Sequence, residues 1–387
     1  LASNKTATLN TESGYTIKNG TVDISNGANA TTGVYVNFGH IVTEKTASDE
    51  GIIKVSKGVA AYGVNGSKIK NEGTVKVDNN GAVAGEIDEK GSYGIVVKGS
   101  AGKFEGKDTT VNTKVTTDKS IGLYSEGELI VKKANVTATD GAINFFAKDG
   151  KININGGGTT ITGQKSLLFY TSGSGKVTLG GAMTATIKGG TTPSTRGTAF
   201  YYVSPIRYGA FNTGAIQNYF NNTFGNGTST LNHLTLNMEQ GSRLFVASNV
   251  GMNLSDTSAT NLMSGITNAP TITGSNYKTF MLYLSKLTIN QAVDLNDSNS
   301  NYAQLEIANS SIENANNMTG SQNRQVAMAQ ENGKDTHSVP FPASQVKLTN
   351  DTTGKINLTG EETTGMYVKR GQIDNKGEIS VGKKSTA

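Results

Sequence analysis

The chain has 387 residues, of which 35% are hydrophobic and 17% are charged, and it contains 48 Gly, 5 Pro and neither Cys nor Trp. So little apolar material argues against a compact enzyme core, and the lack of cysteine excludes disulfide staples, thiolate zinc sites and a cysteine nucleophile. The formal charge of +5 comes from scattered lysines, without a basic run interleaved with aromatics. We therefore expect no nucleic-acid partner.

No stretch approaches the roughly 18 consecutive apolar residues of a membrane span, and residues 1–5 do not resemble a signal peptide. We therefore expect a mature or excised piece of a larger protein. Val, Ile, Leu, Phe and Tyr recur in short alternating groups, which disordered segments lack. The sequence thus predicts strands.

A five-residue pattern recurs along the chain: a glycine, a short polar or charged residue, an apolar residue, any residue, and a second apolar residue. Each copy predicts a turn that enters a strand and puts its two apolar residues on one face. The seven copies begin at Gly20, Gly73, Gly127, Gly150, Gly175, Gly354 and Gly377.

A second pattern places a Gly or Ala beside an apolar or aromatic cluster, and these clusters follow one another at steps of 20 to 31 residues where the pattern is regular. A repeat of this length, without helical periodicity, buries its apolar face only by stacking on its neighbours. The Leu-rich consensus of leucine-rich repeats is missing, and propeller blades need longer repeats of about 40 residues. The clusters include Tyr35, Tyr62, Tyr93, Tyr124, Phe146, Tyr170 and Tyr367.

These repeats predict an all-β fold, a right-handed parallel β-helix with inserted loops. The hand follows the general chirality of parallel crossover connections. Because side chains alternate along a strand, the apolar pairs of the repeats should face the lumen. The residues assigned to the lumen are Val22, Ile24, Val75, Val77, Ile152, Ile154, Ile379 and Val381.

The regular pattern fails between about residues 190 and 345, where all five prolines and four of the five arginines lie. Alternating strand segments persist there, so we predict that the coils continue with loops inserted between them. This interpretation divides the chain into coils over 1–190, interrupted coils over 191–345, and further coils over 346–387. Residues 255–276 and 311–345 are predicted to be exposed loops.

The most unusual segment is 199–224, which holds eight of the 26 aromatic residues. Aromatic rings flanked by Asn, Gln and Arg offer flat apolar faces together with directional hydrogen bonds, which suits a sugar ring or a protein hot spot. Alternatively, 200–203 is a core strand and the rest packs a loop onto the β-helix. On the first interpretation the ligand-binding residues are Arg196, Tyr201, Tyr202, Arg207, Tyr208, Phe211, Tyr219, Phe220 and Phe224.

The sequence shows no recognisable catalytic constellation. His40, His233 and His337 are isolated, and no Gly-x-Ser-x-Gly elbow occurs, which argues against a serine hydrolase. The acidic groups at 49–50 and 86–89 could serve a β-helical lyase or glycosidase, but such runs are more often solvated turns. We expect no enzymatic activity, no metal site and no cofactor.

Residues 363–381 read Thr-Thr-Gly-Met-Tyr-Val-Lys-Arg-Gly-Gln-Ile-Asp-Asn-Lys-Gly-Glu-Ile-Ser-Val, and their first six residues are similar to 31–36. These repeats resemble the passenger repeats of bacterial type V autotransporters, in particular the very large fusobacterial adhesins. The resemblance covers 14–190 and 345–387 and hardly touches 191–344. It implies a right-handed β-helical passenger that a C-terminal β-barrel, absent from this chain, carries to the outer face of the bacterial outer membrane.

The resemblance further implies a cell-surface adhesin that attaches to host cells or to other bacteria through a receptor protein or a glycan. No binding residue of the family can be transferred, so the inserted loops are where we expect the ligand. Two other classes stay open: a pore-forming or toxin passenger, which would need exposed hydrophobic segments, and a β-helical polysaccharide-active enzyme, which would need an acid cluster.

Overall fold

The structure is a computed structural model of the chain. It describes residues 2–3, 14–18, 21–24, 31–37, 39–44, 51–55, 58–64, 66–71, 73–78, 93–116, 120–225, 231–264, 266, 268–331 and 346–387. The chain forms two compact units. The first comprises Leu1–Tyr201, Tyr219–Ser242 and Thr267–Ser275, and the second comprises Tyr202–Asn218, Arg243–Ile266 and Asn276–Ala387.

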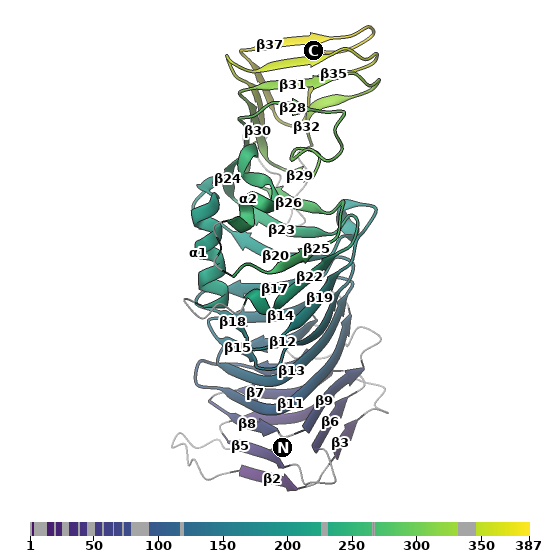
Figure 1. Cartoon of the computed structure of the whole chain (residues 1–387). Helices are drawn as coiled ribbons and strands as arrows, with labels where there is room; N and C mark the ends of the chain where they lie inside the picture. The colour runs from purple at the N-terminus through teal and green to yellow at the C-terminus, as the bar shows by residue number, and fades with distance from the viewer. Residues whose placement is uncertain are drawn as a thin grey trace. The chain divides into compact units, whose positions relative to one another are not determined.

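Within the described residues, the first unit is a parallel β-helix whose strands fall into three walls (Figure 1). Most coils contribute one strand to each wall, and these strands pair in parallel with their counterparts in the neighbouring coils. The predicted β-helix is confirmed, and its right-handed winding stays a prediction. The first wall contains, in spatial order, β1 (Ala2–Ser3), β4 (Thr31–Asn37), β7 (Gly58–Val64), β10 (Tyr93–Val97), β12 (Ile121–Ser125), β14 (Ile143–Lys148), β17 (Leu167–Ser172) and β20 (Thr198–Val203).

The second and third walls belong to one sheet, because β11 (Lys103–Thr116) and β13 (Glu128–Thr139) run from one wall into the next. A register shift between Gly106 and Thr110 marks the corner. The second wall also holds β2 (Gly14–Lys18), β5 (His40–Glu44), β8 (Lys68–Asn71), β15 (Lys151–Ile154) and β18 (Lys176–Leu179). The third wall also holds β3 (Thr21–Ile24), β6 (Gly51–Val55), β9 (Gly73–Asp78), β16 (Gly158–Thr162), β19 (Met183–Ile187), β22 (Leu234–Met238) and β25 (Thr271–Thr273).

The lumen is lined by the apolar residues of the repeats, stacked one per coil. Val75, Val77, Ile152 and Ile154 are fully buried, as the repeat register predicts. Val22 is half-buried and pairs with buried Ile53. In the second unit, Ile379 and Val381 are half-buried and lie opposite buried Ile356 and Leu358. The side chain of Ile24 lies outside the described residues.

In two of the repeats, the opening glycine is required by close stacking of coils. A Cβ atom at Gly127 would lie 2.2 Å from the carbonyl oxygen of Gly102, and one at Gly175 would lie 2.0 Å from that of Ala147. Real Cβ atoms do not approach a backbone oxygen so closely, so only a residue without a side chain fits.

The second unit is also built from stacked parallel strands. Its first sheet segment is β23 (Arg243–Ser248), β26 (Lys278–Tyr283) and β29 (Leu305–Ala308), and β32 (Val326–Glu331) pairs with β35 (Thr364–Lys369). A second sheet runs through β21 (Gly209–Ala210), β24 (Val250–Asn253), β27 (Lys286–Ile289), β30 (Ser311–Asn314), β33 (Lys347–Asn350) and β36 (Gln372–Asn375). A third runs through β28 (Val293–Asp294), β31 (Asn317–Gly320), β34 (Lys355–Leu358) and β37 (Glu378–Val381).

The prediction that 311–345 forms an exposed loop is wrong for 311–331, which supplies β30, β31 and β32; residues 332–345 lie outside the described residues. The pattern was missed because polar residues occupy inward positions. Asn314 is fully buried and donates to Asn350 Oδ1 at 2.9 Å, and Asn350 donates to Asn375 Oδ1 at 2.9 Å. This asparagine ladder satisfies the buried amides, so the coil needs no apolar residue there.

Helices occur where the coil pattern is interrupted. They are η1 (Pro193–Thr195), α1 (Thr213–Phe224), η2 (Leu231–His233), η3 (Leu254–Thr257) and α2 (Ala259–Ser264). Residues 255–276 are therefore not a plain exposed loop, because they contain most of η3, all of α2 and strand β25. Leu254, Thr257 and Leu262 are buried and anchor this segment.

Candidate functional site

Four of the nine ligand-binding residues expected from the sequence are core residues. In the first unit, the rings of Phe220 and Phe224 pack edge-on against Phe200 at 5.1 and 6.1 Å, and Tyr219 lies 6.5 Å from the same ring. Burial raises the pKa of the Tyr219 hydroxyl. These side chains close a core and present no face to a ligand. This agrees with the alternative interpretation, in which the segment after 200–203 packs onto the β-helix.

In the second unit, Phe211 is fully buried and stacks on Tyr202 at 4.7 Å. Arg207 and Tyr208 lie on an exposed turn, where the guanidinium sits 4.9 Å from the centre of the Tyr208 ring. Ser204 Oγ accepts a hydrogen bond from Ile206 N and holds the turn in shape. Of the expected residues, Arg196, Tyr201, Tyr202, Arg207 and Tyr208 thus remain at least partly accessible.

The burial of the other aromatics follows from helix α1, which the sequence analysis did not find. Ile216, Tyr219, Phe220 and Phe224 are spaced at three and four residues, so they share one face of a helix. Asn212 Oδ1 accepts a hydrogen bond from Ala215 N at the first turn. Gly225, with φ of +93°, ends the helix. Asn is a usual residue at the start of a helix and Gly at its end. Asn212 and Gly225, on either side of residues with this spacing, were the signal from which the helix could have been predicted.

A second set of aromatics lies on the outer face of the first wall. Strand pairing places one outward residue per coil in a single column, which we call the aromatic strip. Val96 takes the position in β10, and the contact between Tyr170 and Tyr201 extends the column into β20. The aromatic strip consists of Tyr35, Tyr62, Tyr124, Phe146, Tyr170 and Tyr201.

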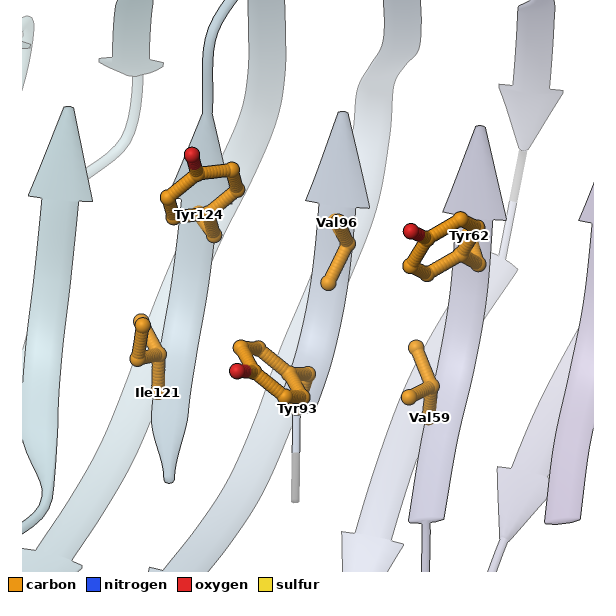
Figure 2. Close-up of a cluster of buried hydrophobic side chains, with 6 residues drawn as sticks. All are labelled: Val59, Tyr62, Tyr93, Val96, Ile121 and Tyr124. Atoms are coloured by element: carbon orange, nitrogen blue, oxygen red, sulfur yellow. The ribbon is translucent and has the colours of Figure 1, made fainter. Parts of the chain in front are cut away.

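A second outward column runs beside the aromatic strip and gives it an apolar flank. Figure 2 shows three coils of this face, with Tyr62, Val96 and Tyr124 in one row and Val59, Tyr93 and Ile121 in the other. A ring in one row stands beside an aliphatic side chain in the other. Because of this alternation the six side chains pack together on the sheet and are between 0% and 8% exposed.

The accessible part of the aromatic strip lies on three consecutive coils. Phe146, Tyr170 and Tyr201 are each half-buried. Their ring centres are 4.6 Å apart between Phe146 and Tyr170, and 5.5 Å apart between Tyr170 and Tyr201. Ile143 and Leu167, also half-buried, pair beside them in the flanking column. The result is a line of touching rings along the wall, each partly open at the surface.

Charged groups border the strip at Glu126. Its carboxylate accepts hydrogen bonds from the Tyr124 hydroxyl at 2.5 Å, from Gly99 N at 2.9 Å and from Lys148 Nζ at 3.2 Å. Burial raises the pKa of this carboxyl, but the three hydrogen bonds together outweigh it and hold the pKa below its ordinary value. The tyrosine hydroxyl is therefore fixed in direction by an ionised acceptor.

The acidic groups at 49–50 and 86–89 lie outside the described residues. Across the part of the chain that the structure describes, no three His, Asp or Glu side chains come together as a metal site. No helix among those residues is long and apolar enough to cross a membrane. Comparison with known proteins gives no matching family model, no matching curated protein and no matching solved structure.

Proposed function

We propose that this chain is a non-catalytic binding region of a bacterial cell-surface adhesin, and that it holds its receptor on host cells or partner bacteria with the aromatic strip. The observation that carries the proposal is the line of three half-buried rings, Phe146, Tyr170 and Tyr201, on consecutive coils. The resemblance of the repeats to autotransporter passengers supplies the surface location.

Aromatic side chains supply most of the binding free energy at interfaces, because a flat ring buries a large apolar area at a small cost in side-chain entropy. The strip also has what a specific surface requires, a polar border next to an apolar line. Glu126 and Lys148 provide that border on the neighbouring coils. The receptor is thus expected to be elongated, with repeated flat apolar faces, as a glycan chain has.

The test uses point variants, because deleting 204–224 would remove the buried Phe211, Phe220 and Phe224 and unfold the chain. We expect Tyr170→Ala and Tyr201→Ala each to weaken attachment of the full chain to host cells by roughly tenfold or more, the effect of losing one interface hot spot. Tyr367→Ala is the matched control, because this tyrosine is 45% exposed on β35 of the second unit.

Attachment that is unchanged in the Tyr170→Ala and Tyr201→Ala variants, with circular dichroism equal to that of the parent, would remove the strip from the binding surface. Treating the cells with periodate, which cleaves sugar diols, should abolish attachment if the receptor is a glycan. Loss of attachment only after protease treatment would identify a protein receptor instead.

A further inference from the structure

The outer face of the second wall of the first unit carries a line of five basic side chains that is interrupted once, by Glu128. Strand pairing aligns one outward residue per coil, at a spacing of ~4.8 Å between neighbouring strands. Strands β8, β15 and β18 of this wall can be followed in Figure 1. We call this line the basic column; in spatial order it consists of His40, Lys68, Lys103, Glu128, Lys151 and Lys176.

Two pairs within the basic column bring like charges directly opposite each other: Lys68 with Lys103, and Lys151 with Lys176. Like charges at directly opposed positions destabilise a sheet. Lys103 has an acidic neighbour, since its Nζ lies 3.2 Å from Glu128. Among the described residues, no ion pair is formed by Lys68, Lys151 or Lys176.

In the second unit, lysines on neighbouring strands form ion pairs with acidic residues. There Lys347 Nζ lies 2.8 Å from Asp374, and Lys355 Nζ lies 3.7 Å from Glu378, so each lysine on these strands has an acid on the neighbouring strand. The chain thus neutralises stacked lysines with acids on neighbouring strands, and in the basic column Lys103 has such a partner in Glu128 whereas Lys68, Lys151 and Lys176 form no ion pair among the described residues. A local arrangement that costs stability without a compensating contact is typical of a functional site.

An open groove lies at one end of the basic column. Four basic side chains line it, and the acidic contribution is a single carboxylate, that of Glu105. Ile41 and Ile69, which are both buried, complete its lining. The basic residues of the groove are His40, Lys68, Lys70 and Lys103.

We propose that the basic column binds a linear acidic polysaccharide, a chain with sulfate or carboxylate groups on successive sugars. One sugar of an extended chain is about as long as one strand spacing, ~4.8 Å, so anionic groups along the glycan can meet the ammonium groups of the two lysine pairs, Lys68 with Lys103 and Lys151 with Lys176, on either side of Glu128. Each bound anion also relieves the repulsion between stacked lysines. Among the described residues of this face, aromatic rings do not alternate with these lysines, so the stacking partners with which proteins hold single-stranded nucleic acid are missing there.

The experiment measures binding of the full chain to heparin, a sulfated linear glycan, and to heparosan, its unsulfated and carboxylated counterpart, as the salt concentration rises. We expect the logarithm of the affinity to fall linearly with the logarithm of the salt concentration, as for any contact with a linear polyanion. The double variant Lys151→Gln, Lys176→Gln should reduce the magnitude of that slope by roughly two, one per lysine. Because it removes a like-charge pair, its stability should equal or exceed that of the parent.

The matched control is Lys347→Gln, Lys355→Gln, which lowers the net charge equally on lysines that already have acidic partners. The proposal is supported if the parent binds either glycan and only the Lys151→Gln, Lys176→Gln variant binds it more weakly. Tighter binding of heparin than of heparosan would indicate recognition of sulfate groups, and equal binding would indicate recognition of carboxylate groups. An equal loss in both variants, no binding to either glycan, or better competition by single-stranded DNA than by heparin would overturn it. Tyr170→Ala should keep full heparin binding, which separates this face from the aromatic strip.

Discussion

The first and third walls of the first unit face the same lumen but differ on their outer faces. On the third wall, buried Ala185 lies between outward Thr184 and Thr186, and buried Leu236 lies between outward Thr235 and Asn237. On the first wall, strand β10 is buried at every position. The outward positions that hold threonines on the third wall are occupied here by the residues of the aromatic strip and by Val96.

The difference is the reason that the proposed receptor-binding surface is placed on the first wall and not on the third. A strand with one solvated face alternates apolar and polar residues, as the third wall does, whereas continuous apolar strands are normally covered on both sides. In β14 and β17 the first wall keeps apolar or aromatic residues at outward positions, although Phe146 and Tyr170 there are half-buried. Apolar area that stays partly in contact with water contributes less to folding and is the kind of surface that partners cover.

The largest expected effect tests the inner face of the third wall. Val75 is fully buried in β9, and its neighbour Thr74 is half-buried and points outward. Val75→Asp places an unpaired charge in the lumen and should cost about 4 kcal/mol or more of unfolding free energy. Thr74→Asp should change it by about 0.5 kcal/mol at most. Urea unfolding followed by circular dichroism compares the two, and similar midpoints would mean that the inward register is wrong.

The next effect separates the two faces of the first wall at adjacent residues. Phe169 points inward and packs against Phe145 at 5.4 Å and Phe224 at 5.1 Å, while Tyr170 points outward. Phe169→Ala should lower the unfolding free energy by about 3–5 kcal/mol, because it leaves a cavity in the core. Tyr170→Ala should lower it by less than about 1.5 kcal/mol, the scale of one aromatic contact, and should weaken receptor attachment. A large stability loss in Tyr170→Ala would make the aromatic strip structural.

The third effect probes how closely the first wall approaches the third. A Cβ atom at Gly122 would lie 2.4 Å from Val136 Cγ1 and 2.6 Å from the carbonyl oxygen of Asn144. Gly122→Ala should therefore cost about 1–3 kcal/mol through overpacking. At Gly214, on the exposed side of α1, the nearest atom to an added Cβ is 3.4 Å away, so Gly214→Ala should be neutral or stabilising. Equal thermal midpoints for both variants would show that the two walls are less tightly packed.

The sequence predicted the β-helix and its register because those features repeat. Val75 and Ile152 belong to copies of one pattern, and each copy supports the same inward face. What was missed occurs once. Helix α1 interrupts the coil, and its apolar residues follow the helical period and not the period of a strand. Phe220 and Phe224 were therefore predicted to be exposed binding residues, whereas the helix places both in the core.

The aromatic strip was not predicted either, although its residues belong to the repeat. Tyr62, Tyr124 and Tyr170 were visible as members of the repeat, but only strand pairing shows that they align in one outward column. Residues that are more than 20 positions apart in sequence become neighbours through the length of a coil. Tyr201 was the one predicted binding residue that belongs to this column, through its contact with Tyr170.

The smallest expected effect concerns the polar border of the first wall. The folded-state pKa of Glu126 is lowered, so its carboxylate adds stability above the unfolded pKa of about 4.3, and this contribution is lost as the pH falls through the folded pKa. The parent should therefore lose more unfolding free energy between pH 6 and pH 3 than Glu126→Gln does. The difference should stay below about 1 kcal/mol, because the partner ammonium of Lys148 is half exposed and the ion pair is screened. Tyr124→Phe, which removes the 2.5 Å hydrogen bond, should shift the urea midpoint at pH 6 in the same direction as Glu126→Gln. If the parent and Glu126→Gln lose equal stability on acidification, the Glu126 carboxylate is not held by its three donors, and the aromatic strip has no fixed polar border at this residue.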